Sequence, residues 1–144
     1  MKKISYIIIL VVAILLASCE QNIDVNNNQA NKAEGEWVVK AYINGTNVFG
    51  SFPIRTYSTI SGKDSLNINE YEGLFWDFNV KAAVTAENTF QTQHSVNAVS
   101  GKKIGIKVQN GRIINNDSIY MEVQFEDDET PYGITYQLAG HRTK

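Results

Sequence analysis

Apolar and polar residues alternate one by one along most of the chain after residue 34. Near the start of this region, Trp37, Val39 and Ala41 alternate with Val38 and Lys40. Successive side chains of a β-strand point to opposite faces of a sheet, so this period of two indicates strands with one buried face. The same alternation recurs at residues 52–60, 76–84, 103–108, 119–125 and 134–139, and shorter pieces of it occur at 66–69 and 89–92.

The alternation predicts eight or nine strands. No long stretch has the apolar spacing of an amphipathic helix, although a short helix fits Ala82–Asn88. Asn44-Gly45 and Asn110-Gly111 each predict a two-residue hairpin turn, because both residue types tolerate positive φ. We therefore expect an all-β fold, an antiparallel meander that closes into a barrel of about eight strands and so removes exposed strand edges. A β-sandwich is the alternative.

The N-terminus has the features of an export signal that ends in a cysteine. Lys2 and Lys3 precede Ile7–Ala17, an unbroken apolar run that is shorter than the roughly 20 residues needed to span a bilayer. The sequence Leu-Ala-Ser-Cys at residues 16–19 resembles the bacterial lipobox, which implies cleavage before Cys19 and acylation of its side chain. Two or more acyl chains would anchor the protein stably. The alternatives are a secretory signal with an incidental cysteine and an uncleaved anchor.

Cleavage before Cys19 would divide the chain into a signal peptide, residues 1–18, and 126 mature residues. Residues 19–34 are rich in Asn and contain only two large aliphatic side chains, so we expect a flexible tether with a reach of roughly 20 Å. Residues 35–144 suffice for one domain with a single core. The mature chain has eleven basic and fifteen acidic side chains, a net charge of about −4, which argues against nucleic-acid binding.

The sequence contains no motif that predicts catalysis or metal binding. No Gly-x-Ser-x-Gly elbow occurs, and the two histidines, His94 and His141, are expected at the surface. The acidic run Glu126–Glu129 lacks the spacing of a calcium loop, so a solvated hairpin loop is favoured there and also at Glu70–Glu72. Two distant histidines and an acylated cysteine do not make a zinc site. We therefore predict no catalytic residue, no metal and no cofactor.

Aromatic residues fall on the inward phase of the predicted strands. They either fill the barrel core, as side chains do in eight-stranded barrels, or line a small apolar cavity that is open at one mouth. These core or cavity candidates are Trp37, Trp76, Phe78, Phe90, Phe125 and Tyr136. On the opposite phase, Tyr42, Tyr57 and Tyr120 are candidates for an outward contact patch.

Three stretches carry a family resemblance. They read GEWVVKAYING at residue 35, GLFWDFNVKAAV at residue 73, and NGRIINNDSIYMEVQFEDDETPYGITYQLAGHRTK from residue 110 to the end. In this order they resemble the small lipoproteins of Bacteroidetes grouped as the lipid-binding putative hydrolase family, over the whole of residues 35–144. The resemblance implies a lipocalin-like (calycin) barrel of eight strands, secretion, lipidation, and lipid binding or hydrolysis. It assigns no catalytic residue.

These observations lead to one favoured function and two alternatives. We expect a non-enzymatic lipoprotein of the cell envelope, held by lipid on Cys19, that binds a small apolar ligand or lipid in its barrel. The outer membrane is favoured over the inner, and the leaflet is left open. The first alternative is a structural module that contacts an envelope protein partner. The second is a hydrolase that acts on a lipid-like substrate.

Overall fold

The computed structural model describes residues 33–58, 64–86, 88–92, 95–99 and 101–144. Cys19, the export signal and His94 lie outside the described residues. Across the described ranges, no helix has the length and apolar character to cross a bilayer. The strands are β1 (Gly35–Ile43), β2 (Thr46–Ser58), β3 (Ser65–Asn69), β4 (Asn79–Ala86), β5 (Thr89–Gln91), β6 (Ser95–Val96), β7 (Gly105–Ile114), β8 (Ser118–Phe125) and β9 (Tyr136–Arg142).

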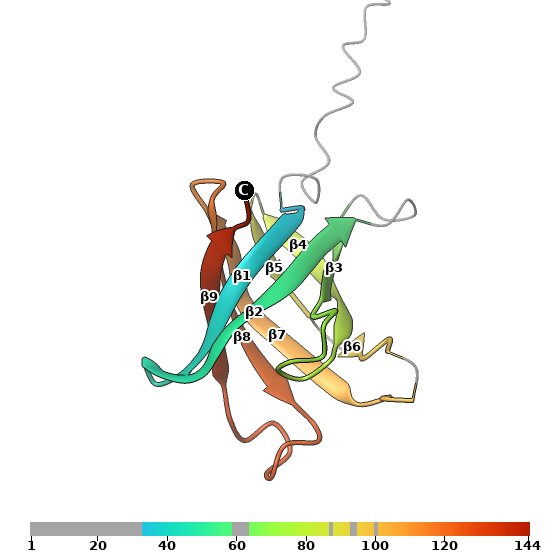
Figure 1. Cartoon of the computed structure of the whole chain (residues 1–144). Helices are drawn as coiled ribbons and strands as arrows, with labels where there is room; N and C mark the ends of the chain where they lie inside the picture. The colour runs from blue at the N-terminus through green and yellow to red at the C-terminus, as the bar shows by residue number, and fades with distance from the viewer. Residues whose placement is uncertain (1–32, 59–63, 87, 93–94, 100) are drawn as a thin grey trace, which may run out of the picture.

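Eight of these strands close into an antiparallel barrel (Figure 1). Their order around the ring is β5-β4-β3-β2-β1-β9-β8-β7, and β5 pairs with β7 to close it. The two-residue β6 pairs with the start of β7. Most neighbours in the ring are also neighbours in the sequence, but β1 pairs with β9, the last strand. The predicted all-β barrel of about eight strands is confirmed, and the β-sandwich alternative is wrong.

The first predicted hairpin turn is confirmed. Asn44 and Gly45 have φ values of 48° and 80° and connect β1 to β2 where Ile43 pairs with Thr46. Positive φ at both central residues gives the turn that follows the natural twist of the flanking strands. The predicted short helix at Ala82–Asn88 is wrong, because β4 continues through Ala86, with Ala82 and Val84 on its buried face.

The second predicted hairpin turn is wrong. Asn110 and Gly111 lie inside β7, where the ladder to β8 is interrupted between Gln109 and Arg112. Asn110 has a φ of 52°, so the pair forms a bulge instead of a turn. A Cβ atom at Gly111 would collide with the ring and the carbonyl oxygen of Phe90, its partner across the barrel seam. Gly111 is therefore what lets the short β5 approach β7 and close the ring.

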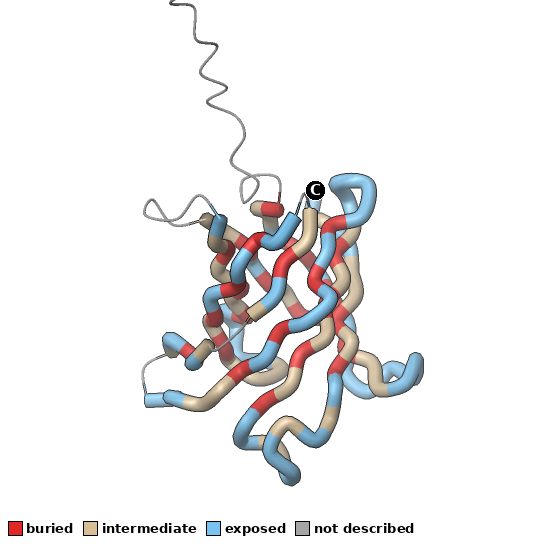
Figure 2. Tube along the Cα trace, turned by 180° about the vertical axis from the view of Figure 1, so that it is seen from behind, coloured by how far each residue is buried: buried red, intermediate tan, exposed pale blue. Residues whose placement is uncertain are grey.

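The barrel interior is packed with side chains. Figure 2 shows buried positions alternating with exposed or partly exposed ones along the strands. The pattern is regular in β8, where Ile119, Met121, Val123 and Phe125 are each at most 1% exposed. The other large, fully buried side chains are Trp37, Phe52, Phe78, Phe90, Ile54, Leu66, Ile68, Ile106 and Leu138. The core of the protein therefore occupies the space that a hollow barrel would leave for a ligand.

The two ends of the barrel differ in what covers them. The start of β1 and the end of β9 lie together at one end, here called the termini end, where the Arg142 guanidinium donates to the carbonyl of Glu34 at 2.7 Å. The β1–β2 hairpin, the β3–β4 loop and the β8–β9 loop project from the opposite end, here called the loop end (Figure 1).

Candidate functional site

A buried carboxylate shapes the loop that covers the loop end. Glu70 is fully buried, and its two carboxylate oxygens accept hydrogen bonds from the backbone N–H groups of Glu72, Leu74, Phe75 and Asp77 at 3.0–3.3 Å. The solvated loop expected at Glu70–Glu72 is thus wrong for Glu70. A carboxylate that accepts several N–H bonds replaces the water it loses on burial. Glu70 thereby holds residues 71–77 in a compact turn across the barrel.

The compact turn places two aromatic rings over the barrel opening. The Phe75 ring stacks on Phe52 with centroids 4.9 Å apart, and the Trp76 indole stacks on Phe125 at 4.2 Å with planes 6° apart. Both rings also contact Tyr136, each at 5.4 Å. Such offset and edge contacts add to the burial of apolar area. The loop end is therefore closed by aromatic rings from four elements, namely β2, the β3–β4 loop, β8 and β9.

The acidic β8–β9 loop fastens this aromatic cluster. Sequence pattern favours a solvated loop here, but Asp127 accepts from the Trp76 indole N–H at 2.8 Å, and Asp128 accepts from the Tyr136 hydroxyl at 3.0 Å. Burial, then the bond to Asp128 and the nearby charge of Glu129, raise the pKa of Tyr136 from 10.0 to about 12. The acidic side chains thus serve as acceptors for aromatic donors.

The six aromatic candidates all belong to or border the core. Trp37, Phe78, Phe90, Phe125 and Tyr136 are buried, and Trp76 is partly buried against the same cluster. Trp37 lies at the termini end, where its indole N–H donates to Thr56 at 2.9 Å and the Arg142 guanidinium lies 4.2 Å from the ring centroid. The structure therefore places these residues as core filling, divided between the two ends of the barrel.

A cavity of about 500 Å³ lies beside the aromatic cluster at the loop end. Phe75, Trp76 and Ile104 line it together with charged groups that already have partners. Lys102 forms an ion pair with Asp77 at 2.8 Å, and the carboxylate of Asp127 holds the Trp76 indole. The polar groups of this cavity are thus engaged with one another.

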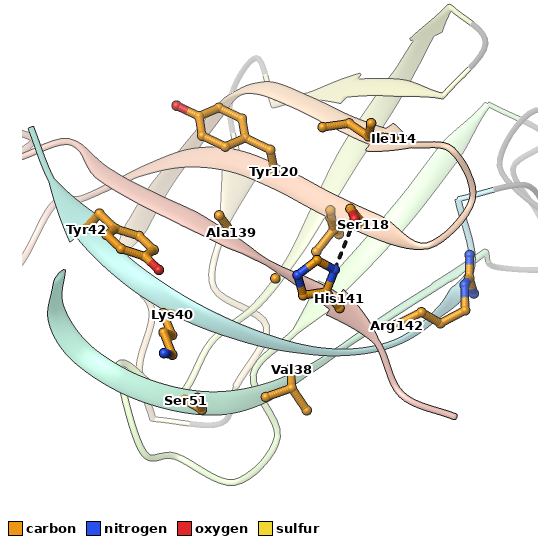
Figure 3. Close-up of a pocket in the computed structure, with 12 residues that line it drawn as sticks. Val38, Lys40, Tyr42, Ser51, Ile114, Ser118, Tyr120, Ala139, His141 and Arg142 are labelled. Carbon is orange, nitrogen blue, oxygen red and sulfur yellow. Dashed lines mark hydrogen bonds between the residues drawn. The ribbon is translucent and has the colours of Figure 1, made fainter. Parts of the chain in front are cut away.

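A second cavity, of about 490 Å³, lies on the outer wall of the barrel and is here called the outer groove. Its floor is β9 at Ala139 and Gly140, and its sides come from β1 and β8 (Figure 3). The trough exists because Ala139, the smallest outward side chain there, lies between Lys40 and Tyr120 in the sheet register. The lining residues are Val38, Lys40, Tyr42, Ser51, Ile114, Ser118, Ile119, Tyr120, Ala139, Gly140, His141 and Arg142.

The backbones of β1 and β9 approach closely at the groove floor. A Cβ atom at Gly140 would collide with the carbonyl of Val38 and the Cα of Val39. Two of the exposed large hydrophobic side chains of the described chain, Val38 at 41% and Ile114 at 42%, lie on opposite sides of this floor. An apolar trough with a few polar groups has the composition of a ligand site, and its volume falls in the usual range of about 300–1,000 Å³.

The outward tyrosines separate into two locations. Tyr42 and Tyr120 both line the outer groove, as an outward contact patch would require. Tyr57 instead accepts a hydrogen bond from Asn79 at 3.0 Å, on another part of the wall. Tyr120 is fixed in place, because its hydroxyl donates to Glu122 at 3.0 Å and the Arg112 guanidinium lies 4.2 Å from its ring centroid. Burial and the Glu122 contact raise the pKa of Tyr120 above 10.0.

One serine–histidine contact borders the groove. The Ser118 hydroxyl lies 3.1 Å from Nδ1 of His141 and 2.9 Å from a carboxylate oxygen of Asp117. In a catalytic triad the acid orients the histidine, whereas here Asp117 contacts the serine. His141 is exposed, as the sequence predicts. Among the described residues, no group of three or more His, Cys, Asp or Glu side chains could hold a metal ion.

Comparison with known proteins agrees with this architecture. Residues 22–144 match the family described as lipid-binding putative hydrolase. The chain belongs to this family. Its barrel fold and the family's description together support lipid binding. A search of curated proteins finds no match to the sequence.

Proposed function

We propose that this protein is a lipid-anchored, non-enzymatic member of its family that binds an apolar ligand in the outer groove. The observation that carries the proposal is the groove itself, an apolar trough of about 490 Å³ flanked by Tyr42 and Tyr120. Its location differs from the expectation of a ligand inside the barrel. The interior supports the outer location, because aromatic and aliphatic side chains occupy it and the Glu70-held loop closes the loop end.

The anchoring half of the proposal rests on the sequence at Cys19. Substitution of Cys19 by Ala should release the chain from the membrane fraction, since the acyl chains supply the binding energy, about 0.8 kcal/mol per buried methylene. Fractionation of the envelope and mass measurement of the N-terminal peptide test this expectation and the outer-membrane location. An unmodified Cys19, or a C19A chain that stays membrane-bound, would contradict it.

The binding half is tested by filling the groove. In Ala139→Trp the new indole would occupy the floor between Lys40 and Tyr120, so binding of radiolabelled dodecanol in equilibrium dialysis should be lost. Ala83→Trp is the matched control, because Ala83 is an exposed, outward alanine on β4, away from the groove. Both variants should unfold at nearly the wild-type temperature, since surface substitutions change stability by about 0.5 kcal/mol or less. Undiminished binding by Ala139→Trp would place the ligand elsewhere.

A second function, protein interaction, is favoured by the loop end. Four exposed large hydrophobic residues lie on the β1–β2 hairpin side and the β3–β4 loop, namely Val48, Phe49, Tyr71 and Leu74. Exposed apolar patches of this kind mark contact sites. A photo-crosslinking residue at Leu74 in cells should capture an envelope protein that the same residue at the exposed Val96, which is outside this patch, does not. Equal capture at both positions would argue against this function.

A further inference from the structure

We propose that the ligand of the outer groove is a free single-chain amphiphile with an anionic head, and that Lys40 binds the head. This inference rests on the proposed function and adds the class of ligand. It follows from three features of the groove: the position of Lys40, the engagement of the neighbouring acids in other contacts, and the width of the apolar floor.

Lys40 is the cation at the centre of the groove wall. It is an exposed, outward residue of β1, and it pairs in register with Ala139 on the floor. Figure 3 shows its side chain on the same side of the floor as Tyr42, with Val38 and Ile114 toward the other end. A head group at Lys40 would therefore leave its tail lying along the floor toward the two exposed aliphatic side chains.

The acids near Lys40 are engaged elsewhere. Glu36, four residues away on the same face of β1, forms an ion pair with Arg55 at 2.6 Å. Glu122 accepts from Tyr120 at 3.0 Å and from Asn110 at 2.9 Å. Within the described ranges, no ion pair involves Lys40. Its ammonium group therefore keeps its full capacity for an anionic partner, with which a hydrogen bond is stronger than between neutral groups.

The other basic side chains of the groove, His141 and Arg142, lie at its termini end. Arg142 is held by the carbonyls of Glu34 and Asn116, and by the Trp37 ring. His141 contacts Ser118. These contacts fix the far end of the groove, so the freely available charge is at Lys40.

The width of the floor fits one acyl chain. Three residues of β9 lie between Gln137, which is opposite Tyr42, and His141, which is opposite Val38. At the rise of a strand the four steps from Gln137 to His141 span about 14 Å, and Lys40 lies opposite the midpoint, Ala139. Side chains from β1 and β8 rise on either side of a floor that is one strand wide, which leaves room for a single chain and excludes a two-chain lipid.

The test compares two probes that differ only in their heads. Dodecanoate and dodecanol, below the concentrations at which they aggregate, are titrated into the full chain by calorimetry at neutral pH. The wild type should bind dodecanoate more tightly than dodecanol. In Lys40→Met, dodecanoate should bind roughly threefold to tenfold more weakly, the range expected for an exposed charged contact, and dodecanol should be unaffected. Lys81→Met, an exposed lysine of β4, is the matched control and should bind both probes like the wild type.

The outcomes separate this inference from the proposed function. If the wild type bound both probes equally, or if Lys40→Met weakened both alike, the anionic head would be wrong while apolar binding stood. If neither probe bound, the proposed function itself would fail. A third arm measures co-sedimentation of C19A chains with phosphatidylglycerol vesicles. Sedimentation that depends on Lys40 would show that the groove binds a membrane surface, and it would overturn the assignment to a free amphiphile.

Discussion

The inner and outer faces of β1, β9 and β8 differ sharply although they belong to the same three strands. The inner face presents side chains that fill the barrel, such as Leu138 and Met121, both 0% exposed. The outer face presents Ala139 beside Lys40 and Tyr120, which leaves a trough. In this barrel the small residue that leaves a trough, Ala139, lies on the outer face. If the trough binds the ligand, as proposed, stability and binding belong to opposite faces of one wall, and each can be perturbed alone.

The largest effect is expected from the inner face at Phe125. The Phe125 ring is fully buried and contacts Phe75, Trp76, Phe78 and Tyr136. Phe125→Ala should lower the free energy of unfolding by about 3–5 kcal/mol, because it removes buried area and leaves a cavity. Chemical denaturation measures this.

The outer-face counterpart lies on the same strand. Tyr120→Ala should cost no more than about 1 kcal/mol, since its contacts with Arg112 and Glu122 are partly exposed. Equal destabilisation by Phe125→Ala and Tyr120→Ala would contradict the distinction between the inner and outer faces.

A smaller loss is expected where a polar group supports the inner face. Glu70→Gln replaces one acceptor oxygen by an NH₂ group that faces backbone donors, so the free energy of unfolding should fall by about 2–3 kcal/mol. Trp76 emission should shift to the red as the loop loosens. Glu72→Gln, an exposed neighbour, should change neither quantity. A wild-type spectrum from Glu70→Gln would show that the carboxylate does not hold the loop.

Measurements at alkaline pH test how much the neutral hydroxyl of Tyr136 stabilises the fold. Its folded-state pKa of about 12 exceeds the value of 10.0 expected in the unfolded chain. The unfolded state therefore ionises first, and the stability from this phenol, complete below about pH 10, is lost as the pH rises toward about 12. Tyr136→Phe should cost about 1 kcal/mol at neutral pH. Urea titrations at about pH 8 and about pH 11 should show a smaller difference in the free energy of unfolding between wild type and Tyr136→Phe at the higher pH. An equal difference at both pH values would contradict a stabilising role of the neutral phenol.

The smallest change in stability is expected on the outer face at Ile114. Its side chain is 42% exposed and lines the groove. Ile114→Ser should leave the free energy of unfolding within about 0.5 kcal/mol of wild type. It should still weaken dodecanol binding, because the tail loses apolar contact. Val96→Ser, an exposed residue outside the groove, is the control. Unchanged dodecanol affinity in Ile114→Ser would exclude this side chain from the site.

Much of the fold could be predicted from local sequence. A period of two within a strand is enough to decide which side chains point inward, and the buried residues of β8 follow it without exception. The Asn44-Gly45 turn was predictable because the residues on either side of it, Ile43 and Thr46, pair with each other. Asn110-Gly111 has the same two residues, but the ring must close at Phe90, and only Gly111 admits that contact. A closure between distant strands has no signal in a short window.

The candidate site was less accessible to sequence analysis. The outward phase of Tyr42 and Tyr120 was visible, and both line the groove. That Ala139 lies between β1 and β8 depends on the register of β9 with strands far away in the sequence. The sequence predicted a solvated loop at Glu70, because nothing in it marks the partners of this carboxylate. Those partners are backbone N–H groups, which every residue except proline carries.

The pairing of β1 with β9 also bears on how the protein is made. The first strand has no partner on one edge until the last strand exists, and Thr143 still contributes a hydrogen bond to Glu36 at 2.8 Å. During synthesis, the ring therefore cannot close before β9 has left the ribosome. Until β9 emerges, β1 keeps one edge unpaired, and an unpaired edge is a template for pairing with another chain.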